Sequence, residues 1–564
     1  MDKKKKSQEI IHYCDNALQD FCRETVLHSL KYIGNRSLQL WERILFLIAL
    51  FASIAALTQL IRNTYLSWQN TPVIIGISPH PAYIHKIPFP AITVCNMNQV
   101  IKGRVVKYKE NDSDPIPYGF LQMICLRDDT NFSQYKSLPQ PENQLFSEFI
   151  SHHVQDCEGM MRSCRMGGVY QNCSDFFRPV LTDEGLCCLF NAVHPSYLFK
   201  KEPYQHLRDL TATDGRVPVY WNPENGYQKN LPPKYYPRVA SGTGFSMALS
   251  IMFDAEMNDY YCSSTMGPGF KIVLHNPIET PFVKETGLPV QLGYETKFRL
   301  EAIQTEAADD MRNLRQKDRQ CHFNSDSQLR YYLQYSHRNC ERECDSQLFM
   351  KYCGCVPYHL PQMFSNVSEC RLKDFACLTS IKDTSIVIKD YCKSNCLPGC
   401  FDLTYKATTF AAPLTVGGYA VNFLNAENGK NFSTEYIKEN IAVVHFYYEE
   451  NVYHGNMRYS FIGLTQFLSS TGGLLGLFTG FSLISIVEVF YYLILRPIRD
   501  IFTRKKRNKD QYINPRLVHV RSSLYDTKNN TKNVGKLSDV VYFKSKATHH
   551  SLDGRNRESF QFCH

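Results

Sequence analysis

Two long apolar runs interrupt an otherwise mixed pattern of hydrophobic and polar positions along the chain. The first, Ile44–Ile61, carries no formal charge and is close to the minimum length for a helix that spans a bilayer. The second, Phe461–Leu495, is apolar over a longer stretch. Since no comparable run occurs elsewhere, the pattern predicts two membrane-spanning helices, at residues 44–62 and 461–495.

The charges that flank these runs predict the orientation of the spans. Lysine and arginine precede the first run, as in Lys3–Lys6, and follow the second, as in Arg504–Arg507. Because cytoplasmic flanks are enriched in these residues, we expect a multi-pass plasma-membrane protein with both termini in the cytoplasm. The expected segments are a cytoplasmic N-terminal segment (1–43), the first span (44–62), an extracellular domain (63–460), the second span (461–495) and a basic cytoplasmic tail (496–564). The composition of this tail is typical of disordered segments. The net charge of +9 is then mainly a signal of topology, and no nucleic-acid partner is expected.

The second run carries small and polar side chains at helical spacing. Gly472, Gly476 and Gly480 lie four residues apart, and Ser482 and Glu488 follow. A face of glycines lets another helix approach closely. A carboxylate within a span costs roughly 2.5–3.5 kcal/mol on insertion scales, so it should face protein or water. The pattern indicates a water-filled pathway for cations. The alternative is a single-pass anchor whose glycines pack a dimer.

Cysteine usage indicates the same topology independently. Of the 21 cysteines, 18 lie between Cys95 and Cys400, and only Cys14, Cys22 and Cys563 fall in the expected cytoplasmic segments. This partition fits an oxidising exterior and a reducing interior. Five sequons in the extracellular domain are possible glycosylation sites: Asn111, Asn131, Asn172, Asn366 and Asn431. The densest cysteine cluster, residues 340–400, favours disulfides over a zinc site, so neither a metal nor another cofactor is expected.

The extracellular pattern predicts a mixed α+β domain. Alternating β-branched and aromatic residues predict strands at 89–97, 270–277, 296–303 and 441–448. Helices are expected at 328–349 and 144–161, and loops at 112–117 and 218–237. The sequence contains no G-x-S-x-G, HExxH or P-loop pattern, so the chain is not expected to be an enzyme. A channel and a non-conducting receptor both remain open at this point.

Three blocks of the sequence resemble the degenerin and epithelial sodium channel family. They are FPAITVCNMNQ (89–99), CERECDSQLFMKYCGCVPYHLP (340–361) and GGLLGLFTGFSLISIVEVFYY (472–492). The pair Cys187–Cys188 and the Trp68-x3-Pro72 region are most similar to the arthropod pickpocket branch. The resemblance implies a trimer with two helices per subunit and a disulfide-rich ectodomain, in which helical lobes surround a β core. It also implies an amiloride-sensitive, sodium-selective pore lined by the second helix.

The resemblance assigns roles to residues of the second span. Gly480, Phe481 and Ser482 match the Gly-x-Ser selectivity tract, where a break in the helix is expected to present backbone carbonyls to the ion. Ser469 matches a small residue near the outer mouth and gate. Glu488 matches an acid on the inner part of the pore helix, and pairing with a basic residue near the cytosolic face is its alternative role. The other residues expected along the pore are Gly472, Gly473 and Gly476.

The resemblance also implies a set of disulfide bonds. The implied pairs are Cys95–Cys187, Cys164–Cys173, Cys321–Cys400, Cys340–Cys396, Cys344–Cys392, Cys353–Cys377 and Cys355–Cys370. The remaining extracellular cysteines are expected to pair as Cys125–Cys157 and Cys188–Cys262. Spacing alone does not fix any of these connections.

One position departs from the family pattern. Where the family carries a His-Gly pair before the first span, this chain has His28 followed by Ser29. The glycine is expected to permit a tight re-entrant turn, and serine there costs backbone freedom. Opening as a homomer is therefore in doubt. The region 65–70 contains none of the adjacent histidines of the acid-sensing branch, so proton gating is not supported.

The sequence therefore predicts a subunit of a sodium-selective cation channel that admits sodium passively, depolarises the cell and serves sensory signalling. The expected partners are sodium ions, the lipid bilayer and related subunits in a homo- or heterotrimer. The alternative is a non-conducting or obligate-heteromer receptor subunit at the cell surface. Neither the gating stimulus nor an extracellular ligand follows from the sequence.

Overall fold

The structure is a computed structural model of the 564-residue chain. It describes residues 19–25, 27, 29–35, 37–70, 73–108, 114–125, 135, 140–141, 144–200, 216–326, 329–362, 368–383, 391–415, 432–499 and 502–503. The chain divides into two compact units, one of residues 55–474 and the other of residues 1–54 with 475–564. Each unit is described by itself. Most of the predicted tail, with Cys14, Pro72 and Cys563, lies outside the described residues.

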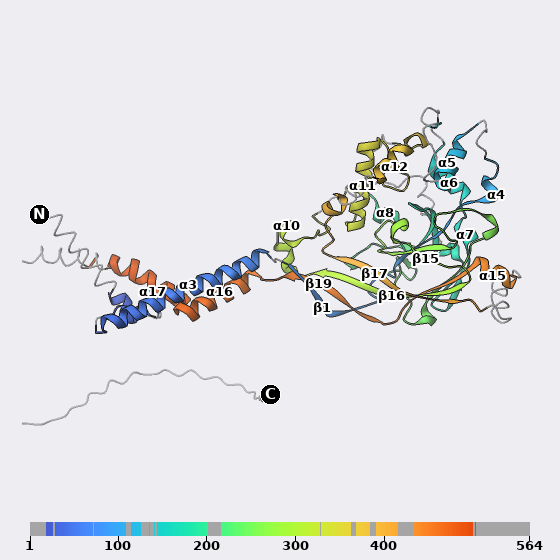
Figure 1. The fold of residues 1–564 in the computed structure, drawn as a ribbon. Helices are drawn as coiled ribbons and strands as arrows, with labels where there is room; N and C mark the ends of the chain where they lie inside the picture. The colour runs from blue at the N-terminus through green and yellow to red at the C-terminus, as the bar shows by residue number, and fades with distance from the viewer. Residues whose placement is uncertain are drawn as a thin grey trace, which may run out of the picture. The chain divides into compact units, whose positions relative to one another are not determined.

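The larger unit is built on an eight-stranded mixed sheet. Its strand order is β1-β19-β16-β18-β12-β4-β5, and β17 pairs with β16. The strands are β1 (Val73–Tyr83), β4 (Met161–Met166), β5 (Val169–Gln171), β12 (Leu249–Asp254), β16 (Tyr294–Ala307), β17 (Asp402–Pro413), β18 (Ile441–Tyr448) and β19 (Val452–Ser460). Strand β16 pairs in parallel with β18 and β19 and antiparallel with β17 (Figure 1).

A second, antiparallel sheet has the strand order β15-β14-β2-β7-β6. Its strands are β15 (Leu288–Val290), β14 (Phe270–His275), β2 (Ala91–Asn96), β7 (Gly185–Phe190) and β6 (Phe177–Thr182). All six residues of β2 are buried, which is typical of a central strand covered on both faces. Phe253 of β12 and Phe270 of β14 pack with ring centroids 4.9 Å apart, so the two sheets share one hydrophobic core.

The strand predictions at 89–97, 270–277, 296–303 and 441–448 are confirmed by β2, β14, β16 and β18. The loop prediction at 218–237 holds only in part, because this region forms pairs of two-residue strands: β8 (Val217–Pro218) with β11 (Tyr235–Tyr236), and β9 (Trp221–Asn222) with β10 (Gly226–Tyr227). A further short pair joins β3 (Asn98–Ile101) to β13 (Tyr260–Ser263).

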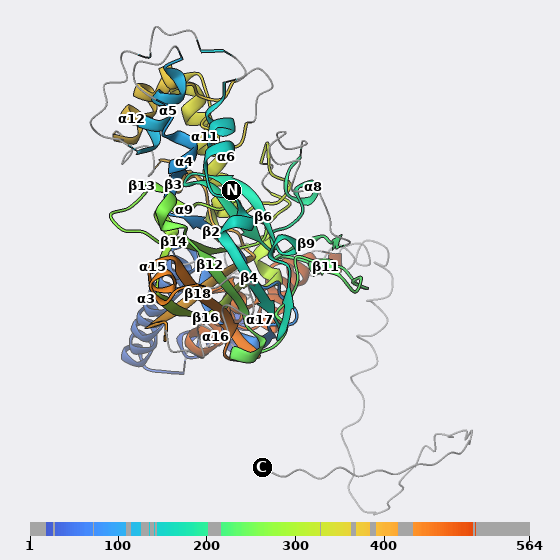
Figure 2. The same ribbon diagram turned by 90° about the vertical axis from the view of Figure 1, so that its right-hand side faces the viewer.

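Short helices gather at one end of the sheets, where Figure 2 shows α5, α6, α11 and α12 together. They are α5 (Ile116–Cys125), α6 (Phe146–His153), α11 (His337–Cys353) and α12 (Phe375–Asp383). The remaining short helices are α2 (Leu30–Ile33), α4 (Lys102–Val105), α7 (Cys157–Met160), α8 (Pro195–Leu198), α9 (Val283–Thr286), α10 (Gln316–Arg319) and α15 (Thr434–Asn440). The last two residues of the expected loop at 112–117, Ile116 and Pro117, therefore lie inside α5.

Both predicted extracellular helices are shorter than expected. The prediction at 328–349 is wrong at its start, because the Glu343 carboxylate accepts from the backbone N–H groups of residues 330–332 and holds them out of the helix. Helix α11 begins after Ser336, whose side chain accepts from the Asn339 backbone N–H. The prediction at 144–161 splits into α6 and α7, because the chain is extended at Val154 and Asp156 caps a new helix.

Nine disulfide bonds join the described cysteines of the larger unit. Seven of them are the pairs that the family resemblance implies: Cys95–Cys187, Cys164–Cys173, Cys321–Cys400, Cys340–Cys396, Cys344–Cys392, Cys353–Cys377 and Cys355–Cys370. The last four of these fasten the helical segments of residues 340–396 to one another, where a hydrophobic core is small.

The expected pairs Cys125–Cys157 and Cys188–Cys262 are wrong, because the structure joins Cys125 to Cys262 and Cys157 to Cys188. Neighbouring residues on a strand point to opposite faces of the sheet. On β7, Cys187 therefore reaches Cys95 on one face, and Cys188 reaches Cys157 at the start of α7 on the other. Cys262 lies on the separate short strand β13, where it meets the end of α5.

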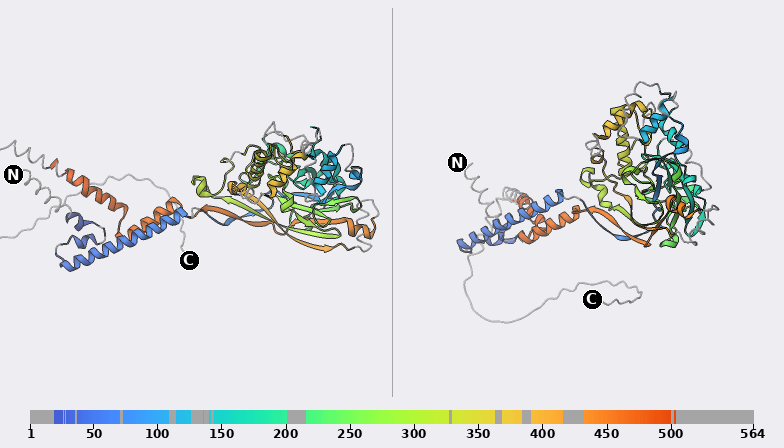
Figure 3. Two further views of the ribbon diagram at one scale, coloured as in Figure 1. Left: turned by 45° about the horizontal axis from the view of Figure 1, so that its top comes forward. Right: turned by 45° about the vertical axis from the view of Figure 1, so that its right-hand side comes forward.

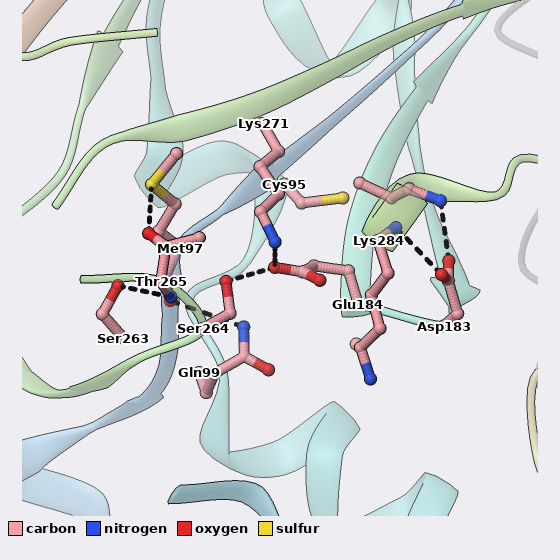
Figure 4. Close-up of polar contacts among 12 residues, drawn as sticks. Cys95, Met97, Gln99, Asp183, Glu184, Ser263, Ser264, Thr265, Lys271 and Lys284 are labelled. Carbon is pink, nitrogen blue, oxygen red and sulfur yellow. Dashed lines mark hydrogen bonds and ion pairs between the residues drawn. The ribbon is translucent and has the colours of Figure 1, made fainter. Parts of the chain in front are cut away.

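A buried ion pair fixes the turn between β6 and β7. The Lys271 ammonium on β14 lies 2.5 Å from the Glu184 carboxylate, whose side chain is fully buried (Figure 4). Ser264 also donates to this carboxylate. The neighbouring Asp183 accepts from the backbone N–H groups of Val283 and Lys284, at 2.7 and 2.9 Å. Two carboxylates at one turn thus connect the hairpin to β14 and α9.

The helices of the predicted spans are α3 (Leu40–Asn70), α16 (Leu464–Thr479) and α17 (Leu483–Phe490). Helix α3 extends beyond the expected 44–62, and it is long and apolar enough to cross a membrane, with a mean hydropathy of 2.5 in its most apolar window. In the larger unit, Trp68 of α3 stacks on Phe467 of α16 with centroids 4.9 Å apart. Figure 3 shows the ribbons of these two helices side by side. A π-helical turn at Tyr491–Leu495 follows α17. Helices α16 and α17 qualify as a second span only when taken together.

Candidate functional site

The second apolar run is interrupted by three residues, Gly480, Phe481 and Ser482. Gly480 has a φ of 70°, a left-handed conformation that glycine adopts without steric cost. Its N–H donates to the Gly476 carbonyl at 2.9 Å, which closes the last turn of α16. Helices α16 and α17 meet at this break with a bend of 65°. The expected interruption of the helix is therefore present at the Gly-x-Ser tract.

Two serines cap the helix that follows the break. The Ser482 hydroxyl accepts from the Ser485 N–H at 3.3 Å, and the Ser485 hydroxyl accepts from the Ser482 N–H at 3.1 Å. This reciprocal capping satisfies two of the N–H groups that a helix start leaves without intrahelical partners. Ser485 is fully buried. Ser482 therefore has a structural task in addition to any contact with an ion.

A hydroxyl from the first apolar helix reaches the end of α16. Ser53 of α3 donates to the Phe478 carbonyl at 2.7 Å. The last carbonyls of a helix lack intrahelical donors, so Ser53 supplies one that the broken helix cannot. Backbone that leaves helical geometry within a span is tolerated only where protein buries it or it lines water. The break can thus present polar backbone atoms to a solvated cation.

The glycine face of α16 is open in the single chain. No described atom lies within 4 Å of the position that a Cβ would take at Gly472 or Gly473. At Gly476 the nearest such atom is the Phe481 carbonyl oxygen, at 3.9 Å. Ser469, one turn earlier, is exposed. The structure therefore leaves room along this face for a neighbouring helix or for water.

Glu488 lies on α17, on the far side of the break. One of its carboxylate oxygens, Oε2, is buried and accepts no hydrogen bond from the residues that the structure describes. Within the same described part of the chain, no basic side chain forms an ion pair with it. Both predicted roles of Glu488 therefore stay predictions.

The segment before the first apolar helix contacts the end of the second run. Tyr492 donates to the Glu24 carboxylate at 2.5 Å, and the Arg496 guanidinium lies 2.7 Å from Asp20. The Phe21 and Tyr492 rings meet edge to face at 5.6 Å. These contacts are exposed, so each one contributes little by itself. Sequence reasoning missed them, because the paired residues are far apart in the chain.

Ser29 occupies a backbone conformation that favours glycine. Its φ is 70° and its ψ is −34°, and its side chain makes no capping hydrogen bond to α2. Residues held in sparsely populated regions cost about 1–3 kcal/mol each. The positive φ of Ser29 is thus the backbone feature that corresponds to the predicted cost of serine at this position. The adjacent His28 lies outside the described residues.

Among the predicted glycosylation sites, the structure describes only Asn172, and its side chain is exposed beside the Cys164–Cys173 bond. Asn111, Asn131, Asn366 and Asn431 lie outside the described residues. In the described part of the chain, no group of three or more His, Cys, Asp or Glu side chains is arranged to hold a metal ion.

Comparison with known proteins identifies relatives over nearly the whole chain. The sequence profile of the family described as "Amiloride-sensitive sodium channel" matches residues 21–492. Pickpocket protein 28 of Drosophila melanogaster is 34% identical over 519 residues, which cover 89% of this chain and 83% of the relative. The bile acid-sensitive ion channel of Homo sapiens is 25% identical over 493 residues, which cover 84% and 85% of the two chains. The sodium channel protein Nach of Drosophila melanogaster is 22% identical over 515 residues, with 86% and 89% covered.

Proposed function

This chain belongs to the amiloride-sensitive sodium channel family, also called the degenerin and epithelial sodium channel family, and on that premise we propose that it is the subunit of a sodium-selective channel. The family consists of ion channels rather than enzymes. The channel would admit sodium passively and depolarise the cell. The family description supports block by amiloride, and a sensory setting is proposed from the resemblance to the pickpocket branch.

The proposed subunit crosses the plasma membrane twice, at residues 44–62 and 461–495, with both termini cytoplasmic and residues 63–460 outside. Helix α3 supports the first span by its length and hydropathy. The second span requires α16 and α17 to act as one broken helix. Three subunits, identical or related, would surround one pore, and the open glycine face of α16 would supply its wall.

The single observation that carries this proposal is the break at Gly480–Ser482 within an otherwise apolar run. In the proposed channel, backbone carbonyls at this break replace part of the hydration shell of a sodium ion. Reciprocal capping by Ser482 and Ser485 and the hydrogen bond from Ser53 support the break. Ser469 would lie near the outer gate, Gly472, Gly473 and Gly476 along the pore, and Glu488 on its inner part.

A second candidate is an obligate heteromer, and the conformation of Ser29 favours it. A strained serine at the proposed inner turn would disfavour the open pore when all three subunits carry it. A partner subunit with glycine at this position would relieve the strain in part of the ring. A non-conducting receptor would share the ectodomain but would not need the glycine face of the second span.

Whole-cell recording of cells that express the chain tests these proposals. Ser469→Phe is expected to hold the pore open and to give a sodium-dependent inward current that disappears when a large organic cation replaces sodium. Ser470→Phe is the matched control, because this neighbouring serine is also exposed but lies about 100° further around the helix. Equal currents from both variants would contradict a gate at Ser469.

The Ser29→Gly variant separates the two candidates. Current that appears only with Ser29→Gly would identify serine as the obstacle to opening as a homomer. If every variant is silent despite surface expression, co-expression with a related subunit decides the matter. Current with the partner supports the obligate heteromer, and continued silence contradicts the proposal of a channel.

A further inference from the structure

The sequon at Asn172 has a cysteine between its asparagine and its serine. Asn172, Cys173 and Ser174 directly follow β5, and Cys173 forms a disulfide bond with Cys164 of β4. The other four extracellular sequons have aspartate, phenylalanine or valine at the middle position. At Asn172 alone, glycosylation and the closure of a disulfide bond therefore act on adjacent residues.

The two residues that glycosylation of a sequon requires are exposed in the folded chain. Asn172 and Ser174 are exposed, whereas Cys173 between them is only 7% exposed. All three residues of β5 are exposed as well, and β5 is the last strand of the eight-stranded sheet. A glycan on the Asn172 amide nitrogen would extend from a sheet edge into solvent. The fold is therefore compatible with a modified Asn172.

The folded chain holds the sequon in a fixed turn. The Asn172 side-chain oxygen accepts from the Ser174 N–H at 3.4 Å, at the start of the 3₁₀ turn η2 (Cys173–Asp175). The Cys173 side chain belongs to the same hydrophobic core as its partner Cys164. To place the asparagine and the serine together in an enzyme's active site, the segment must leave this surface. The disulfide bond opposes that movement.

The disulfide bond closes a hairpin that is entirely local. Strands β4 and β5 pair antiparallel around Gly167 and Gly168, whose φ values are 60° and 82°. Two-residue turns with positive φ at both positions favour tight hairpins, and hairpins form in about 1–10 μs. Cys164 and Cys173 are 9 residues apart, the smallest separation among the disulfide bonds of the described residues. Both thiols are thus present as soon as Asn172 and its neighbour have been translocated.

We propose that Asn172 is a glycosylation site whose occupancy is set by competition with the closure of the Cys164–Cys173 bond. Chains in which the sugar arrives first are modified and then close the bond, because the modified nitrogen lies at the surface. Chains in which the bond closes first stay unmodified at Asn172. The inference rests on the proposed extracellular placement of residues 63–460, and it does not depend on whether the chain conducts sodium.

The two competing steps are distinct reactions. In the first, the donor is an oligosaccharide on a polyprenyl pyrophosphate. The Asn172 Nδ2 atom forms a bond to the anomeric carbon and loses one proton, and the bond from that carbon to the pyrophosphate breaks with its electron pair on the leaving oxygen. In the second, the Cys164 and Cys173 thiols pass two electrons and two protons to a disulfide carrier of the secretory pathway.

Site occupancy in the full chain, expressed in animal cells, tests the proposal. All of the chain is collected, including any retained inside the cell, and its glycans are removed enzymatically in heavy-oxygen water, which converts each occupied asparagine to labelled aspartate. Mass spectrometry of the peptides should show label on only a part of Asn172. Cys164→Ser leaves the sequon intact and is expected to raise the labelled fraction about twofold or more, because Cys173 then has lost its partner.

Dithiothreitol provides a second measurement on the unmodified sequence. Added during synthesis, it should raise the labelled fraction of Asn172 toward that of the Cys164→Ser variant, since it keeps both thiols reduced. The matched control replaces both Cys157 and Cys188 with serine. Their bond encloses Asn172 in its loop but contains no residue of the sequon, so its loss should leave the labelled fraction unchanged. Ser174→Ala should abolish the label.

Three results would overturn the proposal: no label at Asn172 under any condition, complete labelling without reductant, or a rise in the control as large as in Cys164→Ser. If that variant accumulates too poorly, dithiothreitol decides, and an unchanged labelled fraction overturns the competition. The other sequons are read in the same digest. Label at Asn111 or Asn431 but never at Asn172 would overturn this proposal alone, whereas label at no sequon would contradict the proposed extracellular placement as well.

Discussion

Phe298 and Phe446 of the eight-stranded sheet are fully buried against each other, whereas α16 of the second apolar run contains no buried residue. Helix α3 buries only Leu57. The sheets therefore bury their apolar side chains within one chain. The apolar helices leave theirs exposed, because lipid and neighbouring helices would normally cover them. The single chain therefore contains a complete hydrophobic core in its ectodomain, whereas in the proposed channel the apolar helices would be covered only by lipid and neighbouring subunits.

The two regions also differ in what holds them in place. The larger unit has nine disulfide bonds and a buried ion pair, whereas the break in the second apolar run is held by hydrogen bonds from serines. Changes in the ectodomain should therefore cost more free energy of unfolding than changes at the break. Changes at the break should nevertheless affect sodium current more.

The largest expected effect is the loss of a long-range disulfide. Replacing Cys321 and Cys400 with serine opens a loop with a sequence separation of 79 residues and should cost about 4.5 kcal/mol of unfolding free energy. Replacing Cys164 and Cys173, which are 9 residues apart, should cost about 2.6 kcal/mol. Thermal unfolding of the detergent-solubilised chain measures which of the two disulfide variants loses more unfolding free energy. Equal losses would mean that loop length does not control the stability of this ectodomain.

The buried ion pair comes next. Lys271→Met leaves the Glu184 carboxylate buried without its cation and should destabilise the ectodomain by about 3 kcal/mol. The control is Lys297→Met, since Lys297 pairs with Glu295 at 3.3 Å near the surface, where a pair contributes at most about 1 kcal/mol. Adding Glu184→Gln to Lys271→Met should recover part of the loss in melting temperature. A larger loss of unfolding free energy in the Lys297 variant would contradict the view that burial makes the Lys271–Glu184 pair the more important one.

Acid should weaken the sheets more than the break, because His275 is buried in β14. Burial lowers the pKa of His275 to about 4, while its ring bonds to Thr93 and to the Asn276 carbonyl. The unfolded chain binds this proton near pH 6.5, so the contribution of His275 is present above that pH and is lost as the pH falls toward 4. At pH 5 the loss should be about 2 kcal/mol.

Melting temperatures measured between pH 7 and pH 5 test this dependence. His275→Gln should flatten the dependence on pH, and His454→Gln, at an exposed position on β19, should leave it unchanged. An unaltered slope in the His275 variant would assign the effect of acid to another group.

Gly480→Ala should have a smaller effect on stability and a larger one on function. Alanine at a φ of 70° costs about 1–2 kcal/mol, which is expected to shift the break and to lower sodium current by about tenfold. Gly267→Ala is the control, because Gly267 has an ordinary φ and no atom near its Cβ position. Full sodium current in the Gly480 variant would contradict a filter at this position.

The smallest expected effect is that of Ser53→Ala. It removes one hydrogen bond to the Phe478 carbonyl, a contribution of about 1 kcal/mol, and should alter the ratio of sodium to potassium permeability. Thr64→Ala on the same helix removes only a local hydrogen bond to the Leu60 carbonyl. An unchanged permeability ratio with Ser53→Ala would mean that Ser53 contributes to the packing of the helices and not to the choice of ion.

The elements that sequence predicts best are those whose signal is local. Strands β2, β14 and β18 consist of consecutive β-branched and aromatic residues. The break at Gly480 was expected only from the resemblance of the Gly-x-Ser tract to the family, because Gly472, Gly473 and Gly476 in the same run leave α16 continuous. The start of α11 could not be predicted, because the Glu343 side chain captures backbone groups more than ten residues away.

The contacts that sequence cannot supply are those between distant segments. Ser53 meets Phe478 across 425 residues, and only the apolar run around it signals that a serine there needs a partner. The partners of Cys125 and Cys188 depend on which strand face each cysteine occupies, and spacing carries no information on that.

The π-helical turn at Tyr491–Leu495 changes the helical phase of the second apolar run. Its closing hydrogen bond runs from the Arg496 N–H to the Tyr491 carbonyl, so the turn holds one residue more than an α-helical turn. The stripe of side chains set by α17 is therefore not continued beyond it, and the next residues are advanced by about 100° around the axis. Tyr492 within this turn contacts Glu24, and Arg496 directly after it contacts Asp20, so the surplus residue lies where the second apolar run meets the segment that precedes α3.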